Sequence, residues 1–197
     1  MKNFILLTVA FLAFGFINAQ DKKDMSFGVK GGLNVSSVTN AVQYGANSSS
    51  LIGFHLGVFG EFMVSDKFAI QPELLYSAQG VTVDDSEGNK VDAKLDYINI
   101  PVMAKFYATN SFSLEFGPQI GFLVSAKEKS GGVTTDIKDA TKSTDFGLNL
   151  GMGYDITENM VLGLRYNFGL SQLQKDLGSG EKASKNSVFQ FSFGYKF

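Results

Sequence analysis

The chain of 197 residues contains no cysteine, no tryptophan and one histidine, His55. Without cysteine it can form no disulfide framework, and a single histidine excludes the common zinc sites. Charged residues are also few, because Asp, Glu, Lys and Arg together make up 18% of the chain, against about 25% in an ordinary soluble domain. The 17 basic and 19 acidic residues nearly cancel, so the chain lacks the basic surface of a nucleic-acid-binding protein.

Glycine and phenylalanine are abundant instead, with 22 and 19 residues, and 44% of the chain is apolar. The one continuous apolar run, residues 4–17, follows Lys2 and precedes a polar stretch that contains the small Ala19. This arrangement is typical of a secretory signal peptide, and the run is shorter than the about 20 residues that a transmembrane helix needs. We therefore predict a signal peptide over residues 1–19 and a single mature domain over residues 20–197, with an N-terminal membrane anchor as the alternative.

After residue 20, apolar and polar residues alternate with a period of two. A helix cannot keep this period, so the pattern predicts β-strands that each have one apolar face. Eight segments show the alternation: residues 26–34, 52–62, 68–79, 97–106, 112–125, 145–155, 162–170 and 188–197.

The connections between these segments alternate between short and long. The three short turns cover residues 63–67, 108–111 and 157–159, and the four long connections cover about residues 36–51, 80–95, 126–144 and 171–187. The long connections hold most of the remaining charge. An even number of strands with short turns at one end and long loops at the other is typical of a transmembrane β-barrel.

Two kinds of barrel fit eight alternating strands. A soluble, calycin-like barrel turns its apolar face inward to bind an apolar ligand, whereas a membrane barrel turns that face toward lipid. The eight apolar faces contain no Lys, Arg, Asp, Glu, Asn or Gln, and the polar faces consist mainly of Gly, Ser, Asn and Gln. Small side chains suit the narrow lumen of an eight-stranded barrel.

We therefore predict an all-β fold, an eight-stranded antiparallel up-and-down transmembrane β-barrel. The expected location is the outer membrane, with the N- and C-termini in the periplasm. A soluble secreted β-barrel that binds an apolar ligand is the alternative.

The predicted lumen face carries a set of charged residues in the middle or the short-turn half of the strands. They are Lys30, Glu61, Glu73, Lys105, Glu115, Arg165 and Lys196. Isolated charges in a lumen would be costly, so we expect these residues to pair and block the lumen, with a gated pore as the alternative. Arg165 is the only arginine of the chain, and its planar fork suits bidentate pairing with Glu73 or Glu115.

Three prolines lie within the predicted strands, Pro72 and Pro118 on the lipid face and Pro101 on the lumen face. Proline has no backbone N–H, so each one removes a donor from the hydrogen-bond ladder of a closed barrel. We predict a local bulge at each proline.

The last predicted strand has an aromatic residue at every second position up to the end of the chain. These residues are Phe189, Phe191, Phe193, Tyr195 and Phe197. The pattern resembles the C-terminal signature by which outer-membrane barrels are recognised for assembly. The resemblance implies that the barrel-assembly machinery is a partner of the chain.

Four other segments resemble the PorT-like outer-membrane β-barrel family. Residues 97–106 (YINIPVMAKF) are similar to its strand of hydrophobic, Ile, Pro, hydrophobic, Lys and aromatic residues, and residues 117–121, 145–154 and 165–170 are similar to its later strands. The resemblance covers the mature chain and implies a small barrel of the OmpA and OmpX architecture. The family takes its name from a member associated with protein secretion across the outer membrane, but these motifs specify a barrel and no chemistry.

No pattern indicates catalysis. His55 is expected in the lumen near Ser77, where a Ser–His pair would lack an accessible cleft. We therefore expect no enzyme activity, no cofactor and no metal site, with a membrane-embedded hydrolase as a distant alternative. The expected role is structural, adhesive or secretion-accessory, through the four long loops. The expected partners are outer-membrane lipid and a protein outside the cell or of a secretion system, and no nucleic acid.

Overall fold

The computed structural model describes residues 25–40, 48–84, 89–176 and 182–197 of the chain. The predicted signal peptide, residues 1–19, lies outside the described residues, as do parts of three long connections. The described helix η2 (Lys138–Ala140) is a single 3-10 turn. No helix among the described residues is long and apolar enough to cross a membrane.

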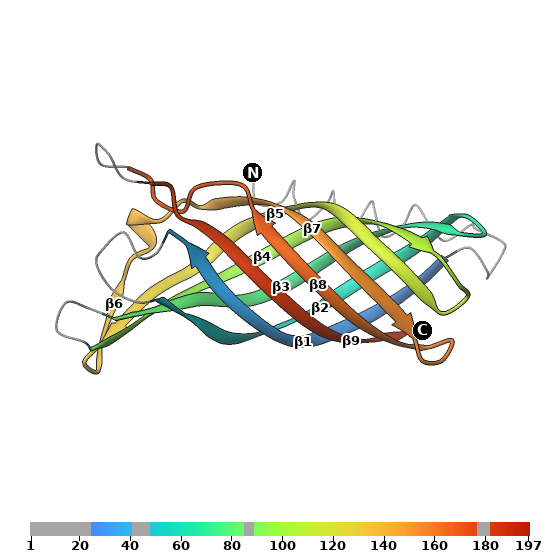
Figure 1. Cartoon of the computed structure of the whole chain (residues 1–197), viewed down its shortest axis with the longest axis horizontal. Coiled ribbons are helices and arrows are strands. Elements are labelled where there is room, and N and C mark those ends of the chain that lie inside the picture. The colour runs from blue at the N-terminus through green and yellow to red at the C-terminus, as the bar shows by residue number, and fades with distance from the viewer. Residues whose placement is uncertain (1–24, 41–47, 85–88, 177–181) are drawn as a thin grey trace, which may run out of the picture.

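Strands account for most of the described chain. They are β1 (Met25–Thr39), β2 (Ser48–Ser65), β3 (Phe68–Asp84), β4 (Lys90–Tyr107), β5 (Phe112–Ser130), β6 (Val133–Asp136), β7 (Thr144–Asp155), β8 (Met160–Gly169) and β9 (Lys185–Lys196). Their order in the sheet is β4-β3-β2-β1-β9-β8-β7-β5-β6, and β4 also pairs with β5, so eight strands close a ring (Figure 1). β6 pairs with the end of β5 and stands outside the ring. The predicted all-β, eight-stranded up-and-down barrel is confirmed.

The alternation of side chains gives the ring two different faces. Outward positions are apolar and exposed, as at Phe54 (51% exposed) and Leu56 (61% exposed). Inward positions are mostly polar and buried, as at Asn34 and Asn149, which are 0% exposed. A soluble barrel has the opposite arrangement. The ring is therefore built to face lipid on the outside and to fill its own interior with polar side chains.

The two ends of the barrel are unlike. The short connections, residues 66–67, 108–111 and 156–159, lie at the end where β1 begins and β9 ends. This end, which we call the turn end, carries the marked C-terminus in Figure 1. The opposite end, which we call the loop end, carries β6 and the longer connections (Figure 1).

The strands extend further at the loop end than the sequence predicts. β3 continues to Asp84, β4 begins at Lys90, and β5 continues to Ser130 before the chain turns into β6. Much of the connections predicted at residues 80–95 and 126–144 is therefore sheet, and the prediction of loops there is wrong. The ladder joins backbone groups, so polar side chains beyond the apolar belt do not end it.

The predicted bulges at the three prolines are also wrong. Pro72 lies opposite Val102 and Pro101 opposite Gln119, and the register is the same on both sides of each proline, Pro118 included. The shifts in register lie elsewhere, between Ser50 and His55, between Met63 and Ser65, and at Asp96/Tyr97. A missing N–H removes one hydrogen bond but inserts no residue, and a bulge requires an inserted residue.

Closure of the ring between β1 and β9 depends on a glycine. A Cβ on Gly32 would lie 1.8 Å from the backbone oxygen of Phe191. We expect Gly32→Ala to force the two strands apart and to lower the free energy of unfolding by about 1–3 kcal/mol. The measurement is urea unfolding of protein refolded into phospholipid vesicles.

Gly163→Ala is the matched control for this prediction. Gly163 also faces the lumen, but a Cβ there would meet the Ser192 side chain at 3.5 Å, an ordinary contact. We expect the control to unfold as the unmodified protein does. Equal stability of the two variants would contradict the role of Gly32 in closure.

Candidate functional site

Arg165 binds two glutamates in the middle of the lumen. Its Nη1 and Nη2 donate to the carboxylate of Glu73 at 2.9 and 2.8 Å, and Nη2 also donates to Glu115 at 2.9 Å. All three side chains are buried. The sequence left open whether Arg165 would pair with Glu73 or with Glu115, and the structure joins it to both.

Two lysines continue the contacts toward the turn end. The Nζ of Lys105 lies 3.7 Å from Glu115 and 2.5 Å from Glu61. The Nζ of Lys196 lies 3.4 Å from Glu61 and 2.9 Å from Asp155. Each ammonium group therefore bridges two carboxylates.

On the other side of Arg165, the Nζ of Lys30 lies 3.2 Å from Glu73. These contacts form one continuous series, which we call the ionic chain. Its order is Lys30, Glu73, Arg165, Glu115, Lys105, Glu61, Lys196 and Asp155. Each of the eight strands of the ring contributes one residue to it. Its acids and bases are equal in number, so the buried charges neutralise one another.

The structure brings all the sequence-predicted lumen charges into the ionic chain and adds Asp155, which the sequence analysis missed. Asp155 is the last residue of β7. Its place in the alternating segment 145–155 already put it on the polar face. The short turn that follows hides its role, because acidic residues are common in turns. Without Asp155, the predicted set has one positive charge in excess.

His55 belongs to a neutral hydrogen-bonded cluster in the lumen. Its Nδ1 lies 2.8 Å from Oδ1 of Asn34, and its Nε2 lies 2.8 Å from the hydroxyl of Ser192. Asn34 also donates to Ser77 at 3.0 Å, so Ser77 lies in this cluster as the sequence suggested. A catalytic histidine is usually oriented by a carboxylate, and here an amide takes that place. His55 is 1% exposed, which leaves no access for a substrate.

Little space remains beside the middle of the ionic chain. An internal void beside Lys30, Lys105 and Arg165 has a volume of about 20 Å³, which is room for about one water molecule. Among the described residues, no three His, Cys, Asp or Glu side chains are grouped so that they could hold a metal ion. The arrangement therefore joins charged side chains from all eight strands of the ring.

Apolar side chains are buried in the lumen at the loop end. A buried cluster there consists of Leu95, Tyr97, Leu123, Ala126 and Leu173. Asp145 lies beside it and accepts hydrogen bonds from Asn186 at 2.8 Å and from Ser171 at 2.7 Å. Both of these partners of Asp145 are neutral groups.

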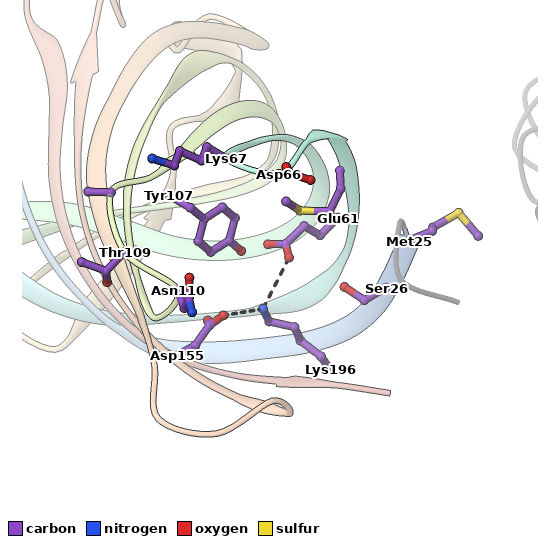
Figure 2. A pocket seen from close by; sticks show the side chains of 12 residues that line it. Met25, Ser26, Glu61, Asp66, Lys67, Tyr107, Thr109, Asn110, Asp155 and Lys196 are labelled. Atoms are coloured by element: carbon purple, nitrogen blue, oxygen red, sulfur yellow. Dashed lines mark hydrogen bonds and ion pairs between the residues drawn. The ribbon is translucent and has the colours of Figure 1, made fainter. Parts of the chain in front are cut away.

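The turn end of the lumen is open and polar. A cavity of about 560 Å³ lies there, between the ionic chain and the short turns. Figure 2 shows the ammonium group of Lys196 between the carboxylates of Glu61 and Asp155, with the Tyr107 ring pointing into the same space. The last link of the ionic chain therefore borders the cavity.

Residues 18–175 match the family described as outer membrane protein beta-barrel domain. The chain belongs to this family. The protein is therefore an outer-membrane β-barrel, as its apolar outer face and polar lumen require. A comparison with curated proteins found no match.

Solved outer-membrane barrels share the fold of this chain. Ail, the attachment invasion locus protein of Yersinia pestis, is 18% identical with a TM-score of 0.55, over 88% of this chain and 99% of Ail. Neisserial surface protein A is also 18% identical with a TM-score of 0.55, over 87% of this chain and 97% of that protein. OprG from Pseudomonas aeruginosa is 17% identical with a TM-score of 0.50, over 88% of this chain and 96% of OprG. At these identities the likeness concerns the fold alone.

We expect Arg165→Met to destabilise the barrel strongly. The variant leaves Glu73 and Glu115 buried without the guanidinium, and the loss of one partner from a buried ion pair costs about 3–5 kcal/mol. The measurement is the free energy of unfolding in urea in phospholipid vesicles. A second substitution, Glu115→Gln, is expected to restore part of the loss because it removes one of the two carboxylates that lost the guanidinium, while Lys105 keeps Glu61 as a partner.

Asp145→Asn is the control for the buried charge itself. Asp145 is also buried, but its contacts are hydrogen bonds to neutral groups. The isosteric change is therefore expected to alter the free energy of unfolding by less than about 1 kcal/mol. Equal losses in the free energy of unfolding for Arg165→Met and Asp145→Asn would show that the ionic chain stabilises the barrel no more than other buried polar contacts do.

Proposed function

We propose that this protein is a non-enzymatic, non-conducting outer-membrane barrel that acts through its loop end. The observation that carries the proposal is the set of side chains inside the barrel. The ionic chain crosses the interior, and the void beside it holds about one water molecule. The apolar cluster closes the lumen at the loop end. With the interior occupied by the protein's own side chains, the surface beyond the membrane remains for a function.

The proposed orientation places the turn end in the periplasm and the loop end outside the cell. Short periplasmic turns and longer extracellular loops are general in bacterial barrels of this kind. The C-terminal aromatic residues belong to the last strand, β9, which closes the ring against β1 and ends at the turn end. Phe191 and Phe193 are each 48% exposed and point outward. We propose that this strand is the part that the barrel-assembly machinery recognises.

The proposed role of the loop end is structural, adhesive or secretion-accessory, with a protein outside the cell or of a secretion system as partner. The hairpin of β5 and β6 projects beyond the ring, and Val133 on it is 67% exposed. The resemblance of residues 97–106 to PorT-like barrels favours a secretion-accessory role. Ail, an attachment invasion locus protein, has the same fold, which favours adhesion as the second candidate.

Two other functions have less support. A soluble, calycin-like barrel needs an apolar cavity inside, and the interior here contains the ionic chain and the His55 cluster. A hydrolase needs an accessible nucleophile with its base, and the Ser192 and His55 pair is enclosed in the lumen.

The filled lumen predicts that the purified protein carries no stepwise current in planar lipid bilayers. Insertion is verified on the same sample by its change in gel mobility on boiling, and bilayers with detergent alone are the control. The void of about 20 Å³ is too small for a hydrated ion path. Regular conductance steps from the inserted protein would refute the blocked lumen.

The orientation is tested with single cysteines, since the chain has none of its own. On intact cells, a membrane-impermeant maleimide is expected to label Thr134→Cys, an exposed position on β6. The control is Asn110→Cys, an exposed position in the turn between β4 and β5, which is expected to react only after the outer membrane is permeabilised. The reverse pattern would mean that the loop end faces the periplasm.

A further inference from the structure

Three exposed lysines gather on the outside of the sheet just beyond the apolar belt at the loop end. They are Lys94 on β4 and Lys127 and Lys129 on β5, and we call them the lysine cluster. Lys94 lies directly opposite Lys127 in the β4–β5 ladder, and Lys129 lies opposite Asp92. Like charges directly opposite one another on neighbouring strands are destabilising. The sheet therefore holds a repulsive pair that a bound anion would relieve.

A shift in register turns these lysines outward. Asp96 lies opposite Ser125 and Tyr97 lies opposite Leu123, so β5 has an extra residue, Val124, at this point. On the turn-end side of the shift, the even-numbered residues of β5 face outward. On the loop-end side, the odd-numbered Lys127 and Lys129 face outward instead. An unbroken alternation would direct both lysines inward with Leu123. The bulge thus re-aims the two side chains, which is a common use of bulges.

The cluster has no ion pair within the described residues. Two acids that lie opposite these lysines accept hydrogen bonds from other groups. Asp92 accepts a hydrogen bond from the hydroxyl of Thr82 at 2.7 Å, and Asp136, opposite Lys127 on β6, accepts one from a backbone N–H at 2.9 Å. Asp96 lies nearer the apolar belt. In the same region, the ammonium group of Lys138 donates to the Val124 carbonyl at 2.9 Å, which places a further positive charge there.

The position of the cluster fits the headgroup layer of a membrane. Val124 is 42% exposed at the upper edge of the apolar belt, and Lys127 follows it by three residues, which is about 10 Å along a strand. Lysine side chains can lay their stems along apolar surface while the ammonium stays in the polar layer. The three ammonium groups therefore reach the depth of lipid phosphates, beside a surface that packs against acyl chains.

We propose that the lysine cluster binds a phosphate group of an anionic lipid in the leaflet next to the loop end. Clusters of basic residues beside a membrane recognise anionic headgroups in this way, and hydrogen bonds between ammonium and phosphate are charge-assisted. The choice of the outer leaflet, and so of a phosphorylated glycolipid, rests on the orientation proposed above. A free phosphate in solution shares the charge but lacks the acyl chains that would pack below the cluster.

The test is native mass spectrometry of the full mature protein in detergent micelles, titrated with purified lipid A that carries two phosphates. The variant replaces Lys94, Lys127 and Lys129 with Gln. We expect its affinity to fall by about fivefold for each lysine, roughly a hundredfold in total. All three side chains are exposed, so folding, checked by gel mobility with and without boiling, is expected to be unchanged.

The control variant replaces Lys67, Lys90 and Lys175 with Gln, which changes the net charge equally. Lys90 is on the same strand as Lys94 but lies opposite Asp84. This control is expected to bind lipid A as the unmodified protein does. An equal loss in both variants would reduce the effect to net charge and overturn the proposal.

Three further ligands separate the possible sources of phosphate. We expect dephosphorylated lipid A to bind the unmodified protein and the cluster variant with the same affinity. We expect inorganic phosphate to compete only weakly with lipid A. The proposal would be overturned if the unmodified protein bound dephosphorylated lipid A as tightly as phosphorylated lipid A. Full displacement of lipid A by inorganic phosphate would also overturn it. Tighter binding of phosphatidylglycerol than of lipid A would overturn the assignment to the glycolipid. These results are independent of the cysteine labelling, which alone tests the orientation.

Discussion

The ionic chain is the interaction on which the rest of this barrel depends. It takes one charged side chain from every strand of the ring and buries them together. Buried charges are costly unless each is paired, so the chain is favourable only when all eight strands are in place. Closure of the sheet and neutralisation of the lumen are therefore one event. This coupling explains how the strands can carry charges in the lumen while their outer faces in the belt that meets lipid are apolar.

Along its axis the barrel changes from open and polar to closed and apolar. The cavity at the turn end borders Lys196 (Figure 2), the ionic chain lies in the middle, and the apolar cluster around Tyr97 lies at the loop end. In the proposed function this interior is a rigid support, and the loop end is the part whose residues meet a partner. The lysine cluster lies where this support leaves the membrane, so attachment to lipid and presentation of the loop end would reinforce each other.

Much of the fold and of the site could be predicted because a period of two is a local property of the chain. It assigned Glu73, Lys105 and Arg165 to the same face without knowledge of any partner strand. The sequence-based prediction was wrong at the prolines and at the ends of the strands. The bulges at the prolines are absent because a missing donor inserts no residue. β3, β4 and β5 continue into predicted loops because polar side chains do not interrupt a backbone ladder.

By itself, the sequence determined which residues share a face of each strand, and the shortage of charge favoured an apolar outside and a polar inside over a soluble barrel. Only the tertiary structure decided which charges meet. Arg165 and Glu73 are 92 positions apart, and their contact depends on the register of every strand between them around the ring. Asp155 enters the ionic chain, and Lys127 turns outward, for the same reason. Register is set by the pairing of neighbouring strands, and no single segment contains that information.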